Sequence, residues 1–509
     1  MILSMDWITP FDWTLPDRTI SGVRTGEEYL TKLRSLVKTK TKADGMIITW
    51  GYHHYFHDSI SKSQLDNICP DLPLIVWHRS FHELYLNSYA LDMTEFEDLE
   101  SLKQHSQVDW DNGHFYEGGM EELLSKSTLF LTMMERLESG YLSAVRAIHA
   151  GGITTIADLE FPMLDESTEF EFANRILKSS IAEFATYCVP SSRYYLKMKG
   201  SHAEAMEEIH NKSSKISSDK MIMFTDHVKI IGDGAFFSQL MQMKDGYTDG
   251  HTGQWFTSPE VTYDTMVQYW RQGYQIHVHT NGDLAMQMLL DNVETLMKEF
   301  PRPDHRTTVE HAGFFTPDQA ARIKKLGCLV SAQPYYHAIL ADKYSEVGLG
   351  EERAKSMCPI GLLEDQDIKF ALHSDFTMAP AQPLLLAWCA VNRVTLTSGQ
   401  CNNPHLCVTP MAALRGNICL VSNNLTKRKY NHAAIEIIIN LFPNYFLNAG
   451  ITLSAAEILG ISDKVGSLET GKDANLVILE QNPLKVDKLK IKDIKIVSRI
   501  FRGKEGKIN

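Results

Sequence analysis

The side chains best suited to chemistry in this sequence stand near the ends of apolar runs. They are His78, Lys229, His279, His311, His337 and Asp375. Two or three imidazoles with a carboxylate suit a borderline divalent metal ion such as zinc. Such an ion lowers the pKa of a bound water to about 7, and a carboxylate beside it, here Asp375, accepts the proton. The pattern predicts metal-assisted attack of water on a carbonyl group.

Lys229 is the unusual member of this set, because a protonated lysine repels a metal ion. It must lie away from the ion or lose its charge by modification. Its simple alternative is an ion pair with Asp226 or Asp233. His311 and Asp375 also have simple alternatives, as a hydrogen-bonded core histidine and as a cap of the following segment.

A further histidine, His277, stands two residues before His279 in the run QIHVHTNGD. Residues two apart in a strand point to the same face, so both rings could meet one ion. The residues alone leave three interpretations open. The two rings are a metal-binding pair, or one is a ligand beside a neighbour, or both are unrelated core histidines.

The apolar runs that carry these residues have the length and the β-branched content of buried strands. They are 73–80, 152–160, 227–234, 275–283, 306–314, 328–336 and 368–376. Helix-like segments lie between many of them, such as 263–273, 284–300 and 316–327. The last has Thr316 as N-cap, Pro317 in its first turn and Gly327 as C-cap. Roughly seven alternating units favour a (β/α)₈ barrel, whose active site lies at the carboxyl ends of its strands.

Bulk composition excludes several other classes of protein. The 509 residues are 44% hydrophobic and 22% charged, and the net charge of −13 argues against a nucleic-acid partner. The eight scattered cysteines form no C-x-x-C motif, which indicates free thiols in a reducing compartment. We find no signal peptide and no apolar segment that could span a membrane. We expect a soluble, cytoplasmic protein that acts on a small-molecule substrate without a membrane partner. A homodimer is one option for its assembly.

Motifs along nearly the whole chain fit one known family together. They are TWGYHHYFH (49–57), WHRSFHELYLNS (77–88), VKIIGDGAF (228–236), HTNGD (279–283), VEHAGF (309–314), HSDF (373–376) and GSLETGKDANLVIL (466–479). This set resembles the amidohydrolase superfamily, and most closely its amidohydrolase-3-type branch, which includes N-substituted formamide deformylases.

The resemblance implies a set of metal ligands for one or two divalent ions, zinc by preference. These are Lys229, His279, His311 and Asp375, with Asp375 also as the general base. It further implies that carbamylation turns Lys229 into an anionic ligand. By its position in the chain, His277 is then a packed histidine or an outer partner of the ligands.

One part of the family pattern is absent. The superfamily carries a His-x-His pair on its first strand, and no such pair occurs near this N-terminus. His53 and His54 are adjacent, so in a strand they would face opposite ways. With His57, we place them on the surface or in a lid. We expect either a chain truncated at its N-terminus or a protein that has lost two metal ligands.

The expected domains follow from this. Residues 1–416 and 451–461 form a barrel that lacks its first strand, and residues 462–509 form the C-terminal part of a composite β domain. Residues 417–450 are an insert, because removing them joins PMAALRG to ITLSAAEILGI in one continuous helix. The apolar composition of the insert fits a surface loop poorly. We therefore favour a retained intron over a genuine loop insertion.

The resemblance predicts a metal-dependent hydrolase of carbon–nitrogen bonds other than peptide bonds, such as amides or N-acyl groups. Residues expected to bind substrate or to support the ligands are His78, His82, His277, His337 and His373. Two alternatives stay open: a barrel without catalysis, because the first-strand pair is absent, and a deaminase with one metal ion. The deaminase would require H-x-x-E where the chain has HTNGD.

Sequencing of the full-length transcript tests the N-terminus and the insert. We expect codons for a His-x-His pair upstream of Met1, and a direct junction of Gly416 with Ile451. A transcript that starts at Met1 and keeps codons 417–450, with peptides of that segment in the purified protein, contradicts both expectations.

Overall fold

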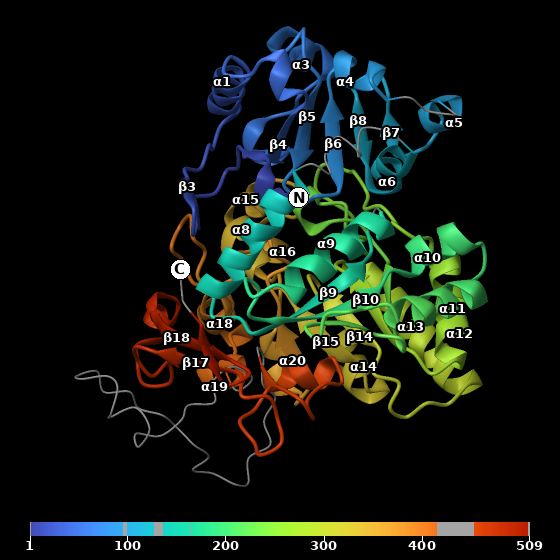
Figure 1. Ribbon diagram of the computed structural model, residues 1–509, viewed down its shortest axis with the longest axis vertical. Coiled ribbons are helices and arrows are strands. Elements are labelled where there is room, and N and C mark those ends of the chain that lie inside the picture. Colours follow the sequence, from blue (N-terminus) through green and yellow to red (C-terminus); the bar gives the residue numbers. More distant parts are fainter. Residues whose placement is uncertain (1, 95–98, 127–135, 164, 415–451, 507–509) are drawn as a thin grey trace. The chain divides into compact units, whose positions relative to one another are not determined.

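A computed structural model describes residues 2–94, 99–126, 136–163, 165–414 and 452–506 (Figure 1). The chain divides into two compact units. Unit 1 comprises Met1–Val145, Leu164–Phe172 and Gly234–Leu240, and unit 2 comprises Arg146–Met163, Ala173–Asp233 and Met241–Asn509. The predicted insert 417–450 and both of its junctions lie outside the described residues.

Unit 1 is built on a six-stranded mixed sheet of order β1-β4-β5-β6-β8-β7. Strands β1, β4 and β5 run parallel, whereas the pairs from β5 onward are antiparallel. The strands are β1 (Asp6–Trp7), β4 (Ile47–Tyr52), β5 (Leu74–His78), β6 (Glu83–Leu86), β7 (Val108–Asp109) and β8 (His114–Tyr116), besides the hairpin β2 (Trp13–Leu15) and β3 (Arg18–Ile20). The helices are α1 (Gly26–Val37), α2 (His54–His57), α3 (Lys62–Ile68), α4 (Ser88–Asp92), α5 (Leu99–Lys103) and α6 (Glu117–Lys126). Helices α8 (Leu137–Ala150) and α9 (Glu166–Lys178) each belong in part to both units.

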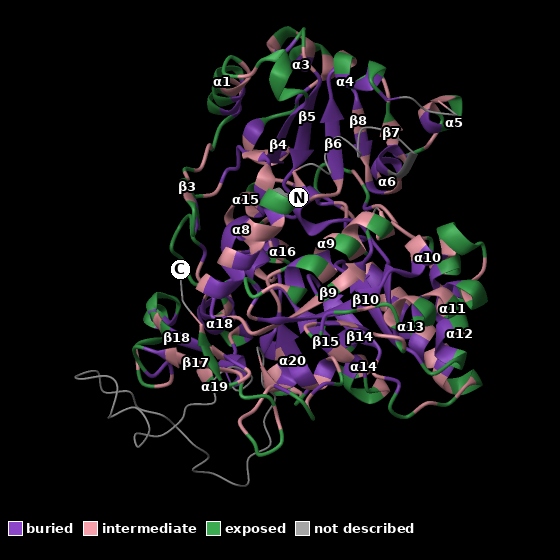
Figure 2. Ribbon diagram, in the orientation of Figure 1, coloured by how far each residue is buried: buried purple, intermediate pink, exposed green. Residues whose placement is uncertain are grey.

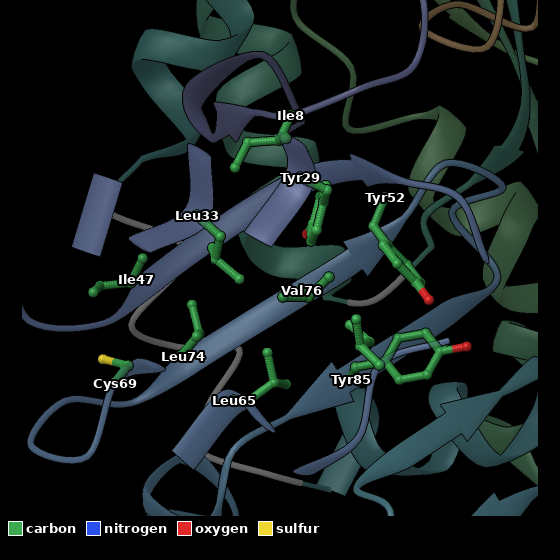
Figure 3. Packing of buried hydrophobic residues seen from close by; sticks show 11 residues of the cluster. Ile8, Tyr29, Leu33, Ile47, Tyr52, Leu65, Cys69, Leu74, Val76 and Tyr85 are labelled. Atoms are coloured by element: carbon green, nitrogen blue, oxygen red, sulfur yellow. The ribbon is translucent and has the colours of Figure 1, made fainter. Parts of the chain in front are cut away.

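A cluster of buried apolar side chains fixes β4 and β5 (Figure 3). Tyr52 from β4 and Val76 from β5 pack with Tyr29 and Leu33 from α1. Every residue of both strands is buried, as the purple ribbons of Figure 2 show. Burying each such side chain contributes roughly 1.5–3 kcal/mol. The cluster therefore holds the carboxyl ends of the two strands side by side, with Tyr52 in register with His78.

Unit 2 alternates parallel strands with helices. Strands β12 to β16 form one parallel sheet in chain order, and β11-β10-β9 form another. A parallel bridge between Ser191 and Lys229 links β10 to β12. The strands are β9 (Thr155–Phe161), β10 (Ala185–Pro190), β11 (Met221–Met223), β12 (His227–Ile231), β13 (Gln275–Thr280), β14 (Thr308–His311), β15 (Leu329–Ala332) and β16 (Phe370–Leu372). The helices are α10 (Ser192–Lys199), α11 (His202–Ser213), α12 (Pro259–Arg271), α13 (Asp283–Glu299), α14 (Pro317–Leu326), α15 (Tyr335–Glu346), α16 (Glu351–Lys355), α17 (Gly361–Asp365), α18 (Pro383–Asn392), α19 (Pro410–Leu414) and α20 (Leu453–Ile458).

Most of the predicted runs form the parallel strands of unit 2. The runs beginning at 152, 227, 275, 306, 328 and 368 correspond to β9, β12, β13, β14, β15 and β16. Helix α14 begins after Thr316, whose hydroxyl accepts the Gln319 N–H, and ends at Gly327 with φ 77°. The run 73–80 forms β5, which pairs antiparallel with β6 in unit 1. It is therefore not one of the parallel strands of unit 2.

The C-terminal residues form an antiparallel sheet of β17 (Leu476–Leu479), β18 (Ile496–Phe501) and β19 (Lys504–Gly506). Short strands joined by turns agree with the β texture expected after residue 461. The boundaries of a barrel and of a composite β domain stay predictions. Of the described helices, none has the length and apolarity to cross a bilayer.

Asn87, at the end of β6, ties the start of β5 to the following helix. Its side chain is fully buried, and its amide oxygen accepts the N–H groups of Leu74 and Ala90, both at 2.9 Å. Its amide nitrogen donates to the carbonyl oxygens of Cys69 at 2.8 Å and Leu72 at 2.9 Å. Four backbone groups therefore depend on one side chain.

Replacing Asn87 by alanine should lower the stability of unit 1. Each buried backbone group left without a partner costs about 1–3 kcal/mol, so we expect Asn87→Ala to lower the free energy of unfolding by about 3 kcal/mol or more. The measurement is a urea titration. Asn67→Ala is the control, because Asn67 is exposed and donates only to the carbonyl of Ser63. Equal small losses in both variants would refute this account of Asn87.

Candidate metal centre

Three of the predicted ligands stand on neighbouring parallel strands of unit 2. Lys229 lies on β12, His279 on β13 and His311 at the end of β14. The register pairs Ile231 with His279 and Thr280 with His311. All three candidate ligands are buried. Because parallel strands end at the same edge of a sheet, His279 and His311 gather there, whereas Lys229 lies two residues before the end of β12, in register with His277.

The rings of His279 and His311 lie edge to face, with centroids 4.4 Å apart. Strict alternation along β14 would turn His311 away from the face that Glu310 occupies. Instead, His311 has φ 73° and the next residue, Ala312, has φ 49°. Non-glycine residues rarely adopt this left-handed conformation, and it is concentrated at functional sites. This conformation ends the regular alternation of β14, so the ring of His311 lies beside that of His279.

Both rings are oriented by neighbouring polar side chains. Hydrogen bonds join His311 Nδ1 to His373 Nε2 at 3.0 Å, and His373 Nδ1 to Ser331 Oγ at 2.7 Å. Another joins Asn281 Nδ2 to His279 Nε2 at 2.8 Å. Such outer partners fix the ring orientation of metal-binding histidines.

The loop after β13 is held by the buried carboxylate of Asp233. This carboxylate accepts backbone N–H groups from Gln242 at 3.0 Å, Asn281 at 2.9 Å and Gly282 at 2.8 Å. Asp233 is fully buried. By accepting the N–H of Asn281, it fixes the backbone of the residue whose side chain orients the ring of His279. The sequence interpretation considered Asp233 only as an ion-pair partner of Lys229 and missed this role.

His277 belongs to a buried chain of hydrogen bonds. Its Nδ1 lies 2.7 Å from Glu310 Oε1 and its Nε2 lies 3.1 Å from His227 Nδ1. Burial raises the pKa of Glu310, but the hydrogen bond and charge of His277 and the charge of Lys229 outweigh it, so this pKa lies below its usual value. Glu310 and His227 escaped the sequence interpretation. A carboxylate within the apolar run VEHAGF was the signal that could have found Glu310.

Asp375 follows β16 and differs from the other three candidate ligands in being exposed. It has a left-handed φ of 47°. Burial and the charge of Asp375 raise the pKa of Tyr336, whose ring lies 6.5 Å from that of His311. Among the described residues, the ligand atoms of His279, His311 and Asp375 do not converge within 4.8 Å as a group of three.

The remaining predicted site residues are His78, His82 and His337. His337 is buried in the first turn of α15, and burial lowers its pKa to about 2. His78 and His82 belong to unit 1. His82 Nδ1 lies 2.6 Å from Glu117 Oε2.

The histidines that we placed on the surface or in a lid are also in unit 1. His53 and His57 are buried, with 0% and 1% of their surface exposed, and His54 is half-buried. The expectation of surface positions is wrong for His53 and His57. The ligand nitrogens of His53, His54 and His78 lie within 4.8 Å of one another.

The chemistry of the unit 2 set fits a divalent ion. Two imidazoles at adjacent strand ends are donors that zinc prefers, and a carboxylate stands at the end of another strand. The buried amine of Lys229 fits only when it is uncharged or carbamylated, because its positive charge would repel the ion. The set is one that could activate water or polarise a carbonyl oxygen.

Known proteins resemble the chain over most of its length. The Amidohydrolase family matches residues 15–416 and 425–505. An N-substituted formamide deformylase of Arthrobacter pascens is 21% identical over 457 residues, covering 87% of this chain and 75% of that protein. Protein LONG AFTER FAR-RED 3 of Arabidopsis thaliana is 23% identical over 483 residues, covering 91% of this chain and 74% of that protein.

Two solved structures share the fold. An uncharacterized metal-dependent hydrolase from Pyrococcus horikoshii OT3 superposes with a TM-score of 0.60 at 18% identity, over 96% of this chain and 83% of that chain. Another from Pyrococcus furiosus superposes with a TM-score of 0.58 at 20% identity, over 95% and 84%. The fold is a TIM-type α/β fold.

Asp233→Asn should weaken metal binding without touching a ligand. The substituted amide has one oxygen in place of two, so it cannot accept all three N–H groups. We expect zinc affinity to fall by about 10–100-fold, as when other outer partners are lost. Competition with a chromophoric chelator measures it. Asp249→Asn is the control, because Asp249 is exposed and its carboxylate bonds His251. Unchanged affinity in folded Asp233→Asn would show that the carboxylate plays no part.

Proposed function

The chain belongs to the amidohydrolase family, and from this we propose that it is a metal-dependent hydrolase of carbon–nitrogen bonds other than peptide bonds. The proposed substrates are small amides or N-acyl compounds. One observation carries the proposal. The ring centroids of His279 and His311 lie 4.4 Å apart at the ends of adjacent parallel strands, and a polar neighbour orients each ring. The relative that is named as a formamide deformylase supports the bond type.

In this proposal Lys229, His279, His311 and Asp375 hold the ion or ions, with zinc suggested by the imidazole donors. When bound, such an ion lowers the pKa of water to about 7 and polarises the substrate carbonyl. Carbamylation of Lys229 would remove its positive charge and supply oxygen donors. The buried contact between His277 and Glu310 links β13 to β14 next to the ligands. His277 lies two residues before His279, and Glu310 directly precedes His311.

Asp375 carries the proton transfers. Its exposed carboxylate stands at the end of a strand and accepts a proton from the attacking water at a carboxylate oxygen. The same oxygen then returns the proton to the leaving amine, which cannot depart as an anion. His373 supports His311 through their hydrogen bond. We assign His337 to substrate contact.

Turnover by zinc-loaded protein tests the function. The substrates are a panel of N-formyl, N-acetyl and cyclic amides, with release of the amine as the readout. His311→Gln should lose at least about 10³-fold in kcat/KM, because it removes metal-assisted charge stabilisation. His210→Gln, at an exposed position on α11, should retain the activity of the unchanged chain.

Other outcomes identify the alternatives. Ammonia release from an amino-heterocycle, without hydrolysis of any amide, replaces the proposal with a deaminase. Failure of the unit 2 residues to bind zinc at all replaces it with a barrel that lacks catalysis.

A further inference from the structure

We propose that His53, His54 and His78 form a second metal site, which takes a divalent ion of the zinc type. The site lies wholly within unit 1, whereas the four ligands of the proposed hydrolytic centre lie in unit 2. One ligand nitrogen from each ring lies within 4.8 Å of the other two. Zinc bound at about 2.1 Å holds tetrahedral nitrogens roughly 3.4 Å apart. Small rotations of the rings therefore suffice to close them on an ion.

The backbone explains how adjacent histidines reach one point. The register between β4 and β5 shifts after Trp50, at Gly51, which has φ 112°. A side chain at Gly51 would meet the Thr9 Cβ at 2.8 Å, so only glycine fits this bulge. His53 then caps α2 in an extended conformation and His54 is its first helical residue. Strand alternation no longer applies there, which is why the prediction of opposite faces failed.

His57 fixes this turn and has both ring nitrogens engaged. The N–H of His53 donates to His57 Nδ1 at 3.2 Å, and His57 Nε2 lies 2.5 Å from the carbonyl oxygen of Val23. The ring of His57 also stacks on Tyr29 at 4.6 Å. It therefore serves as a structural support of the turn. The ring of His53 lies tilted to that of His78 with centroids 5.1 Å apart, and the ring of His54 stacks on it at 5.2 Å.

The ring of His78 has one nitrogen that the described protein does not satisfy. His78 is fully buried, and its Nε2 has no hydrogen-bond partner among the described residues. Its Nδ1 lies 2.9 Å from Ser80 Oγ and 3.1 Å from the Ser80 amide. Either ring tautomer leaves Nε2 unmatched, and a buried unmatched polar atom is costly. An ion on Nε2 removes this cost. It requires the tautomer with the proton on Nδ1, which then donates to Ser80 Oγ in place of accepting the Ser80 N–H.

The charges around the three rings suit a cation. His53 and His78 are fully buried, and metal binding requires both rings to be neutral. The buried Glu83 carboxylate is held by His114, whose Nε2 lies 2.8 Å from Glu83 Oε2. The ionised Glu83 carboxylate lies 3.5 Å from His78 Nδ1. A carboxylate behind a ligand histidine strengthens that ligand.

The nearest positive charge, on Arg79, is held by aromatic rings. Its guanidinium lies over Trp50 at 4.4 Å, Trp13 at 4.9 Å, Phe237 at 5.0 Å and Phe11 at 5.6 Å. These negative ring faces stabilise the cation where it lies. The buried Arg79 cation is thus stabilised in place by four aromatic rings.

Cobalt binding to the full chain tests this site directly. Protein stripped with a chelator is titrated with Co²⁺ alone, and the visible bands and the bound metal are both measured. His54→Gln should lower the bound cobalt by one ion per chain. The control His105→Gln removes another partly buried histidine of unit 1 and should bind as the unchanged chain does. His54 is half-buried, so its substitution spares the fold.

Two further variants separate this site from the hydrolytic centre. The double variant His279→Ala, His311→Ala should keep the cobalt ion of unit 1. His54→Cys should keep the ion too and show a new thiolate-to-cobalt absorption band in the near ultraviolet. This band would not arise if position 54 had only a structural role and did not contact the ion. Full cobalt binding by His54→Gln, no binding by the double variant, or a missing thiolate band would each overturn the site. Equal binding by the double variant and the unchanged chain would instead count against the hydrolytic centre.

Discussion

The carboxylate of Asp233 is the contact on which the candidate centre depends. It follows β12 and accepts three backbone N–H groups, two of them from the residues directly after β13. Three charge-assisted bonds to one buried group are strong, because little water competes for them. The end of β13 is consequently tied to the end of β12, and His279 projects from a backbone that cannot relax. A flexible loop at this point would leave two imidazoles near each other without a fixed separation.

A second constraint is conformational. His311, Ala312 and Asp375 all hold left-handed backbone angles that cost of order 1–3 kcal/mol each. The surrounding parallel sheet supplies the energy that keeps them, through ladders of hydrogen bonds and fully buried strands. Stability gained in the sheet is thus used to turn side chains toward one point. In unit 1 the bulge at Gly51 brings two neighbouring histidines close to a third without this cost, because glycine readily adopts φ 112°.

Local patterns predicted much of unit 2 and little of unit 1. Long β-branched runs and the capped helix after Thr316 could be found, because their burial and capping are local properties. Strand β10, with sequence ATYCVP, was missed because it ends in proline, which argues against a central strand. Lys229, His279 and His311 stand on neighbouring strands, which agrees with their position near run ends. Glu310 and the His53–His54 pair escaped because their roles depend on register and on a bulge, and neither can be read from alternation.

Unit 1 is assembled from three separate stretches of chain, and this has a consequence for its biosynthesis. Phe237, which covers Arg79, and Ala235, whose N–H donates to Glu117, both come from the short stretch Gly234–Leu240. A ribosome that has released the first 150 residues has therefore released a sheet whose buried arginine still lacks one of its aromatic rings. Unit 1 is completed only after β12 has left the exit tunnel. Until then a nascent chain holds the amino-terminal sheet in an unfinished state, in which chaperones would find exposed aromatic surface.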